Sequence, residues 1–282
     1  DHLDFHQDME SYFKAKASLF TLEYADQAFI NIDNDFGLRL FNECEIPATS
    51  LSRNNPKASW HFTSITSNSG GTAFTARGAG GILIESSTPL RGYFNLDNIL
   101  LVLAIAIECG IDPLDCAALI PRLKGAPGRM ESVDCGQDFT ALVDYAHTPD
   151  AVRNVIATAS EFTSGKVIAV LGCGGDRDAS KRPLMGSALI EESGIAIFTS
   201  DNPRSENPGK ILEEMSQHLQ VVQPSRVIVD RHEAIAYAVS LCQPGDTLLV
   251  LGKGHENGQE IKGEKIDFDD RLVLAKILEE SR

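Results

Sequence analysis

Short apolar segments alternate with longer amphipathic segments along the second half of the chain. The apolar segments are rich in Val, Ile and Leu and predict buried strands. These predicted strands span residues 139–146, 166–172, 195–200, 226–230 and 247–252. The segments between them have helical periodicity and predict helices over 149–162, 181–193, 208–219 and 232–242. Such regular alternation predicts an α/β fold in which helices cover both faces of a parallel sheet.

Two of these predicted helices have clear start signals. Thr148 precedes Pro149, and Asn207 precedes Pro208. Thr and Asn side chains cap the first backbone N–H groups of a helix, and proline suits the first helical position because it lacks an N–H. We therefore expect helices to begin at residues 149 and 208.

The first part of the chain mixes helix-like and strand-like segments less regularly. It predicts a helix over 8–20, a strand over 27–33, strands interrupted by glycines over 58–86 and a helix over 95–109. Between residues 119 and 137 the apolar rhythm breaks, and Gly, Pro and basic residues cluster as in a hinge. We therefore place a domain boundary near residue 124, which gives domains of residues 1–124 and 125–282.

Composition and charge narrow the class of protein. The chain has 43% hydrophobic residues but no apolar run long enough to cross a bilayer, so we expect no membrane insertion. Its formal net charge of -15 argues against nonspecific nucleic-acid binding, which depends on Lys and Arg neutralising phosphates. The amino terminus has acidic residues where a secretory signal needs a basic start, so we expect a cytoplasmic protein.

The cysteines carry no recognisable metal or redox motif. None occurs in C-x-x-C or at another zinc-binding spacing, so we expect reduced thiols and no disulfides. The six residues are Cys44, Cys109, Cys116, Cys135, Cys173 and Cys242.

Polar side chains gather at the end of each predicted strand in the second half. The sequences there are DYAHTPD, GCGGDRD, SDNPRSENP, VDRHE and GKGHENGQE. In open parallel sheets, ligands bind beyond the carboxyl ends of the strands. These loops therefore predict a functional site at that edge of the sheet.

One of these loops, within VLGCGGDRDASKRP (170–183), begins like a nucleotide-binding turn. A dinucleotide fingerprint reads G-x-G-x-x-G, and Gly172 and Gly174 occupy its first two glycine positions. Arg177 occupies the third position, which argues against hydride transfer with a dinucleotide cofactor. An arginine flanked by two aspartates instead predicts a loop that grips a carboxylate or a phosphate.

Eight motifs occur in the order and spacing of one known family. They are DHLDFH, YFKAKASLF, GYFNLDN, GAPGRME, VDYAHTPD, GCGGDRDASKRPLMG, DNPRSENP and GKGHE. On these motifs, the sequence resembles the ATP-dependent Mur ligases of peptidoglycan synthesis over nearly its whole length. Members of that family have an amino-terminal domain for the uridine nucleotide, a central ATPase domain and a Rossmann-like carboxyl-terminal domain.

The family's central domain cradles ATP phosphates with a Walker A loop, G-x-x-x-x-G-K-[ST], which this chain does not contain. The resemblance therefore implies that residues 1–124 form the second half of the central ATPase domain. Residues 125–282 would form the whole Rossmann-like parallel-sheet domain. We accordingly expect a chain truncated at its amino terminus and inactive alone.

The resemblance also implies a function in peptidoglycan precursor synthesis. It implies an ADP-forming amide ligase that adds meso-diaminopimelate to UDP-N-acetylmuramoyl-L-Ala-D-Glu through an acyl phosphate. ATP is then a substrate, Mg2+ is a cofactor, and the other partners are small molecules bound by a monomeric enzyme. Three alternatives stay open: a lysine-adding Mur ligase, a relative of the folylpolyglutamate synthetases, and a non-catalytic Mur-like binding module.

Several residues match positions that the family uses around ATP. By resemblance, His2 ligates magnesium directly or through water, and Lys16 is a carbamylated lysine whose new carboxylate binds Mg2+. Asn95 and Asn98 lie three residues apart on one helix face and resemble the pair that contacts the adenine side of ATP. The alternatives are a surface histidine, a solvated lysine and, for Asn95, a helix cap.

Arg129, Asp144 and His147 resemble residues that the last domain brings to ATP, where a transferring phosphoryl group needs a cation. The resemblance assigns these three residues and Lys16 to catalysis, and Arg129 and Asp144 also to ATP binding. Alternatively, Arg129 is a solvated hinge residue and Asp144 a loop cap.

Six residues match the family's pocket for the incoming amino acid, and DNPR is the version found in ligases specific for meso-diaminopimelate. They are Arg177, Asp201, Asn202, Arg204, Gly252 and Glu256. Diaminopimelate carries a second carboxylate and a second ammonium far from its reacting amine, which suit an arginine fork and an acid such as Arg204 and Glu256. Lysine lacks that carboxylate and would leave a buried Arg204 unpaired. The alternative is an arginine and a glutamate that merely bridge loops.

Overall fold

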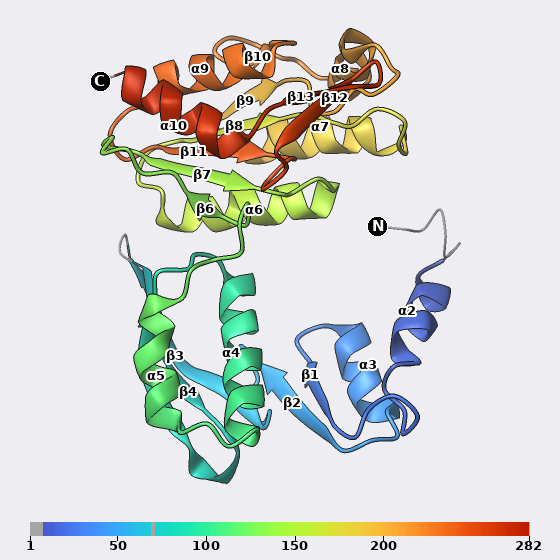
Figure 1. Ribbon diagram of the computed structural model, residues 1–282, viewed down its shortest axis with the longest axis vertical. Helices are drawn as coiled ribbons and strands as arrows, with labels where there is room; N and C mark the ends of the chain where they lie inside the picture. The colour runs from blue at the N-terminus through green and yellow to red at the C-terminus, as the bar shows by residue number, and fades with distance from the viewer. Residues whose placement is uncertain (1–7, 69–70, 282) are drawn as a thin grey trace. The chain divides into compact units, whose positions relative to one another are not determined.

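The computed structural model describes residues 8–68 and 71–281 of the chain. These residues form two compact units that divide between Lys124 and Gly125, and each unit has its own sheet and its own hydrophobic core (Figure 1). His2, a predicted magnesium ligand, lies outside the described residues. Among the helices that are described, none is long and apolar enough to span a bilayer.

The first unit is built on a five-stranded mixed sheet. Its strands are β1 (Ala28–Asn31), β2 (Ala48–Ser52), β3 (Trp60–Asn68), β4 (Gly71–Arg77) and β5 (Leu83–Thr88), in that order across the sheet. Strands β1, β2 and β3 pair in parallel, whereas β3, β4 and β5 pair antiparallel. Strand β2 is not among the predicted strands, because its sequence ATSLS has only one large apolar residue.

Three helices pack on this sheet: α3 (Asp35–Glu43), α4 (Tyr93–Glu108) and α5 (Pro113–Leu119). Helix α2 (Met9–Ala17) contacts α3, and short 3-10 turns are η1 (Ala79–Gly81) and η2 (Ile120–Arg122). Helix α4 buries Leu96, Leu100 and Leu103 in one cluster with Trp60 and Phe74 of the sheet. Removing this apolar surface from water is the main force that holds the helix on the sheet.

Helix α4 begins at Tyr93, two residues before its predicted start, and Gly92 is its N-cap. The helix-cap interpretation of Asn95 is therefore wrong. Asn95 lies inside the first turn, where its side-chain amide donates to the carbonyl of Arg91 at 2.7 Å.

The second unit is built on a six-stranded sheet whose order is β10-β9-β8-β11-β7-β6. The strands are β6 (Glu131–Ser132), β7 (Thr140–Asp144), β8 (Val167–Leu171), β9 (Ile195–Phe198), β10 (Arg226–Val227) and β11 (Thr247–Leu251). Strands β7 to β11 pair in parallel as predicted, and β6, which lies in the predicted hinge, adds an antiparallel edge.

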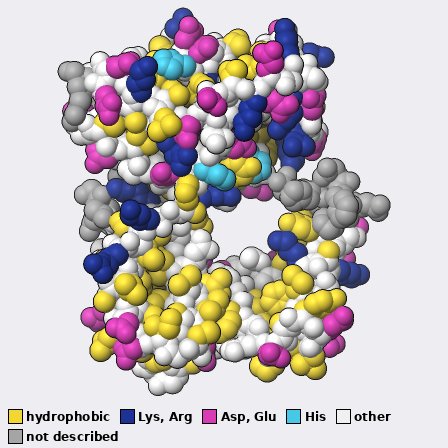
Figure 2. All heavy atoms as spheres, in the orientation of Figure 1, with side chains coloured by type: hydrophobic (Ala, Val, Ile, Leu, Met, Phe, Trp, Pro, Cys, Tyr) yellow, Lys and Arg dark blue, Asp and Glu magenta, His cyan; other side chains and the backbone are white. Residues whose placement is uncertain are grey.

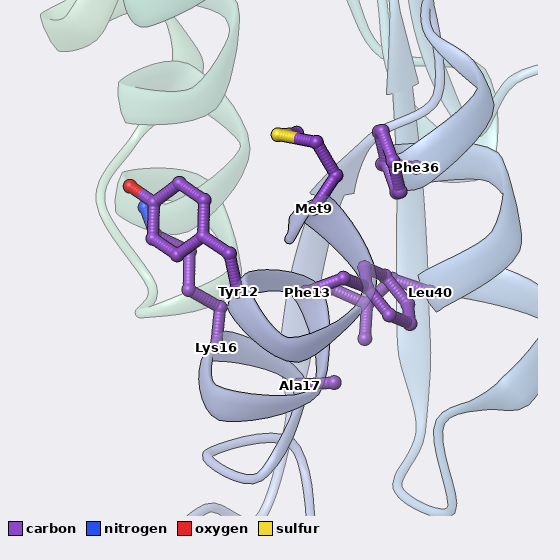
Figure 3. Close-up of a pocket in the computed structure, with 8 residues that line it drawn as sticks. Met9, Tyr12, Phe13, Lys16, Ala17, Phe36 and Leu40 are labelled. Atoms are coloured by element: carbon purple, nitrogen blue, oxygen red, sulfur yellow. The ribbon is translucent and has the colours of Figure 1, made fainter. Parts of the chain in front are cut away.

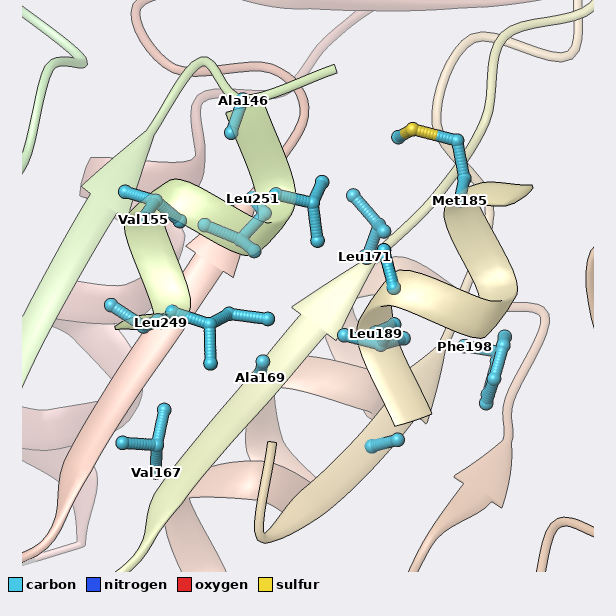
Figure 4. Packing of buried hydrophobic residues seen from close by; sticks show 14 of the residues in the cluster. Ala146, Val155, Val167, Ala169, Leu171, Met185, Leu189, Phe198, Leu249 and Leu251 are labelled. Carbon is cyan, nitrogen blue, oxygen red and sulfur yellow. The ribbon is translucent and has the colours of Figure 1, made fainter. Parts of the chain in front are cut away.

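Both faces of this sheet carry helices, which confirms the predicted α/β architecture. One face packs against α6 (Pro149–Phe162), α7 (Lys181–Glu192) and α8 (Pro208–Ser216), as Figure 4 shows for part of the cluster. The other face packs against α9 (Arg231–Leu241) and α10 (Asp270–Glu280). Every residue of β8 and β11 is buried, as expected for strands covered on both sides.

The predicted helix starts are confirmed. Thr148 caps α6 by accepting from the N–H of Ala151, and Asn207 caps α8 by accepting from the N–H groups of Gly209 and Lys210. Helix α8 ends at Ser216, earlier than predicted, and β10 occupies only the start of the predicted strand 226–230.

The last elements of the chain are not among the predicted ones. These are a hairpin of β12 (Gly258–Ile261) and β13 (Glu264–Asp267), followed by α10. The hairpin matters for the site because Arg204 forms a bridge with Ile261 beside it.

Candidate amino-acid site

The candidate site of the second unit lies where its parallel strands end. Loops begin directly after β7, β8, β9 and β11, and neighbouring parallel strands bring these loops to the same edge of the sheet. All six residues predicted for the amino-acid pocket lie in the loops after β8, β9 and β11.

The loops after β8 and β9 are fastened to each other. The Gly175 N–H donates to the carbonyl of Asn202, and Arg204 Nη1 donates to the carbonyl of Gly175, both at 2.8 Å. The Asp176 carboxylate accepts from the Ser205 N–H at 3.1 Å and from the Ser205 hydroxyl at 2.7 Å. These bonds fix the GCGGDRD loop against the DNPR loop.

Two glycines permit close approaches that a side chain would block. A Cβ on Gly175 would lie 2.0 Å from the carbonyl oxygen of Pro203. Gly252 has a φ of 109°, which favours glycine, and a Cβ there would lie 2.8 Å from Oδ2 of Asp201. Both glycines therefore permit close contacts between loops. The loops after β8, β9 and β11 together form the rim of the candidate site.

Arg182, at the start of α7, is a buried anchor for the same loops. Its guanidinium donates to Glu206 at 2.7 and 2.9 Å and to Glu214 at 2.7 Å. It also lies 3.4 Å from the carbonyl oxygen of Gly174. The hydrogen bonds from Arg182 lower the pKa of Glu206 to about 2, which keeps this ion pair charged at neutral pH.

A second cluster joins the loops after β9 and β11. Asn202 Nδ2 donates to Oε2 of Glu256 at 2.8 Å, and Asn202 Oδ1 accepts from the N–H of Glu260 at 3.0 Å. The fully buried Lys253 ammonium contacts Asn202 Oδ1, Glu256 Oε2 and the carbonyl of Gly258. The predicted pocket residues Asn202 and Glu256 therefore lie in direct contact.

The predicted carboxylate-binding arginines lie on neighbouring parts of this rim. Arg204 is partly buried, and its φ of 51° is held by backbone hydrogen bonds to Glu260 and from Lys262. Strained backbone of this kind clusters at functional sites. Arg177 is exposed, and within the described residues its side chain forms no hydrogen bond or ion pair, so its donors are available.

Asp201 is buried beneath the rim, and burial raises the pKa of its carboxyl. Arg231 lies nearby and is itself fully buried, where it forms an ion pair with Asp270 at 2.7 Å. Arg231 also donates to the carbonyls of Ser200 and Leu251, the last residues before Asp201 and Gly252. This ion pair thus fixes the points where two loops leave the sheet.

Three predicted ATP-site residues lie together at the end of β7. Asp144 is buried and accepts from the N–H groups of Met130 and Ala146, and burial raises the pKa of its carboxyl. Arg129 is exposed, and its guanidinium lies 4.9 Å from the ring centroid of Tyr145. The exposed His147 ring packs edge-on against the Tyr145 ring, with 4.6 Å between the ring centroids.

The remaining predicted ATP-site residues lie in the first unit. Lys16 is exposed on α2, 5.2 Å above the Tyr12 ring, and lines an apolar pocket of about 240 Å3 with Phe13, Phe36 and Leu40 (Figure 3). On α4, Asn95 is buried whereas Asn98 is exposed, so only the Asn98 side chain is freely accessible. Among the described residues, no three His, Cys, Asp or Glu side chains form a metal-binding group.

Arg182, Arg231 and Lys253 are not among the predicted site residues. Each is charged and almost fully buried, and each has at least one partner that is distant in the sequence. The only available signal was position, because all three lie within or directly beside the polar strand-end motifs.

Comparison with known proteins agrees with this arrangement. The sequence model of the Mur ligase middle domain matches residues 1–106, and that of the Mur ligase glutamate ligase domain matches residues 128–254. The chain belongs to the Mur ligase family.

Curated relatives show which members of the family the chain resembles. The chain is 42% identical to the UDP-N-acetylmuramoyl-L-alanyl-D-glutamate–2,6-diaminopimelate ligase of Streptomyces coelicolor, a match that covers 100% of the chain and 57% of the relative. The ligase of the same name from Syntrophomonas wolfei is also 42% identical, over 99% of the chain and 58% of the relative. The chain thus spans somewhat over half the length of these relatives.

Solved structures show the same fold. A UDP-N-acetylmuramoyl-L-alanyl-D-glutamate–2,6-diaminopimelate ligase matches with a TM-score of 0.68 and 35% identity, over 100% of this chain and 58% of that one. A Mycobacterium tuberculosis folylpolyglutamate synthase has a TM-score of 0.68 at 18% identity, over 87% of this chain and 57% of that one. The latter likeness concerns the fold alone.

Proposed function

We propose that the complete protein, meaning this chain with any further residues of its gene product, is an ADP-forming amide ligase. It would join meso-diaminopimelate to UDP-N-acetylmuramoyl-L-Ala-D-Glu. The observation that carries this proposal is the rim of the second unit, where Arg177, Arg204 and Glu256 lie in loops that are fastened together. The names of the most similar relatives support it.

The charges of the rim suit a substrate with two charged ends. Arg204 uses Nη1 to hold Gly175, and its Nε lies 3.5 Å from Oε2 of Glu260. Within the described residues its Nη2 forms no hydrogen bond and is available to a carboxylate. Arg177 adds further donors, and Glu256 offers an acid to an ammonium group. Lysine has no distal carboxylate, so it would forgo a hydrogen bond to a charged group, which contributes about 1.5–3 kcal/mol.

The chemistry we propose has two steps. The D-glutamyl carboxylate takes the terminal phosphoryl group of ATP, which forms an acyl phosphate and releases ADP. The free amine of diaminopimelate then attacks the acyl carbon, an amide bond forms, and phosphate leaves as the nitrogen loses a proton. Arg129 would neutralise charge on the transferring phosphoryl group, with Asp144 and His147 beside it.

We assign the other ATP contacts to Asn95 and Asn98, and the magnesium ligands to His2 and Lys16 as its carbamate. Mg2+ would neutralise charge on the phosphates. The exposure of Lys16 leaves its amine accessible to carbon dioxide, which supports this assignment. We further propose a monomer in the cytoplasm, in keeping with six cysteines that are all free thiols.

The test is the release of ADP by the complete protein with the dipeptide nucleotide and either meso-diaminopimelate or L-lysine. We expect kcat/KM to favour diaminopimelate by about 100-fold or more, because unpaired site groups penalise the shorter substrate. Equal or greater use of lysine would refute the pocket assignment. Binding of diaminopimelate without any ADP release would indicate a binding module in place of an enzyme.

A further inference from the structure

Lys253 is a fully buried cation at the centre of the amino-acid rim. It directly follows Gly252, and its ammonium group has three acceptors within reach. These are the carbonyl of Gly258 at 2.7 Å, Asn202 Oδ1 at 3.2 Å and Glu256 Oε2 at 3.3 Å. An ammonium has three N–H donors, so this environment matches its full hydrogen-bonding capacity.

The contacts of Lys253 act on only one oxygen of Glu256. Oε2 accepts from Asn202 Nδ2 at 2.8 Å as well as from Lys253, whereas Oε1 has no hydrogen-bond partner among the described residues. The Glu256 side chain is 37% exposed, although Lys253 beneath it is 0% exposed. Glu256 is therefore tethered through one oxygen and presents the other toward solvent.

Stability alone does not account for a cation in this position. Burying an ammonium costs desolvation free energy, and apolar side chains often replace buried ion pairs without loss of stability. Two of the three contacts of Lys253 are directed at predicted pocket residues, Asn202 and Glu256.

We propose that Lys253 is a positioning residue for the amino-acid substrate, an inference that rests on the proposed function. It holds Oε2 of Glu256 so that Oε1 is oriented to accept from the distal ammonium of the incoming amino acid. Asn202 completes this support from the loop after β9. Lys253 itself does not touch the substrate, because its ammonium is fully buried and occupied.

The first test replaces Lys253 by methionine in the complete protein. Lys253→Met keeps the length of the side chain but removes its charge and donors. We expect the KM for meso-diaminopimelate to rise about tenfold or more, with kcat within about threefold and the KM for ATP unchanged. An unchanged KM for diaminopimelate in a folded variant would overturn the proposal.

Two controls separate positioning from general damage. Lys276→Met removes an exposed ammonium from α10 of the same unit, and Leu189→Ala truncates the core far along α7. Neither substitution should raise the KM for diaminopimelate selectively. If Leu189→Ala reproduces the effect of Lys253→Met, the role of Lys253 is merely structural.

A double-mutant cycle tests whether Lys253 acts through Glu256. In a Glu256→Gln background the carboxylate is already lost, so Lys253→Met should raise KM by less than about threefold. A full effect in that background would contradict positioning through Glu256.

A crystal structure of the wild-type complete protein with meso-diaminopimelate keeps the proposal testable even if Lys253→Met does not fold. We expect Glu256 Oε2 to stay on Lys253 while Oε1 contacts the distal ammonium. A Glu256 that leaves Lys253 to reach the ligand would overturn the proposal. Absence of diaminopimelate-dependent ADP release by the wild-type enzyme would refute the proposed function. An unchanged KM in Lys253→Met, measured with an active wild-type enzyme, would refute only the role of Lys253.

Discussion

At the scale of single residues, the rim depends on positions where only one residue type fits. Gly252 combines a φ of 109° with the carboxylate of Asp201 directly beside it. Gly263, in the turn between β12 and β13, has a φ of 82° but open space where a Cβ would lie. An added Cβ would therefore collide with a neighbour at Gly252 but not at Gly263, although both positions have a positive φ.

We predict that Gly252→Ala destabilises the chain more than Gly263→Ala does. Gly263→Ala, the control, should lower the free energy of unfolding by about 1 kcal/mol, because alanine is strained at positive φ. Gly252→Ala should lower it by about 2–3 kcal/mol, because the added Cβ must also displace Asp201. Urea unfolding of both variants measures the difference, and equal losses would show that the contact with Asp201 is unimportant.

The resemblance to a known family predicts Arg177, Arg204 and Glu256 as pocket residues, but it does not reveal how they are held. Arg182 and Lys253 are as polar in the sequence as any surface residue, and only the folded chain shows that they are buried. Each has a partner that is distant in the sequence, Glu206 for Arg182 and Asn202 for Lys253. Periodicity carries no information about such pairs.

At the scale of elements, the site is made of loops whose positions depend on ion pairs as well as on strands. The clearest case is Glu206, which links the loop after β9 to Arg182 of α7 and accepts from the N–H of Asp176. These bonds lower the pKa of Glu206 from 4.5 to about 2. The carboxylate form is thus favoured by folding.

The lowered pKa of Glu206 makes the stability of the second unit depend on pH. A carboxyl whose pKa is lower in the folded state contributes stability above its unfolded pKa and loses it as pH falls through the folded pKa. Glu206→Gln should therefore be less stable than the wild type from pH 7 to about 5, with a difference that shrinks between pH 4.5 and about 2.

Denaturant unfolding across this pH range measures the difference, with Glu280→Gln on α10 as a control for the loss of one exposed carboxylate. A Glu206→Gln difference that stays constant down to the lowest pH would contradict the account of this ion pair.

Regular elements were easier to predict than irregular ones. Strands β7, β8, β9 and β11 are almost wholly apolar because both of their faces are covered, and this pattern is visible in the sequence. The β12–β13 hairpin has mostly polar residues and lies outside the main sheet, so no apolar pattern marks it. That hairpin nevertheless holds Arg204.

At the scale of the whole molecule, a chain with a net charge of -15 is proposed to bind the carboxylates of an amino acid. Acidic and basic side chains are interspersed over the visible face of the second unit (Figure 2). The proposed anion binding therefore depends on local arginines at the rim. The fold class was predictable from alternation alone, whereas the proposed substrate rests on motifs, since one fold serves many functions.

We propose that the edge of the second sheet binds meso-diaminopimelate through Arg204. Calorimetric titration of the complete protein with meso-diaminopimelate and with L-lysine, repeated with Arg204→Lys, is the direct test. We predict that diaminopimelate binds more tightly than lysine and that Arg204→Lys weakens it about tenfold or more, because a point charge replaces a two-pronged donor. Equal affinities for the two amino acids, or an unchanged affinity in Arg204→Lys, would contradict the claim.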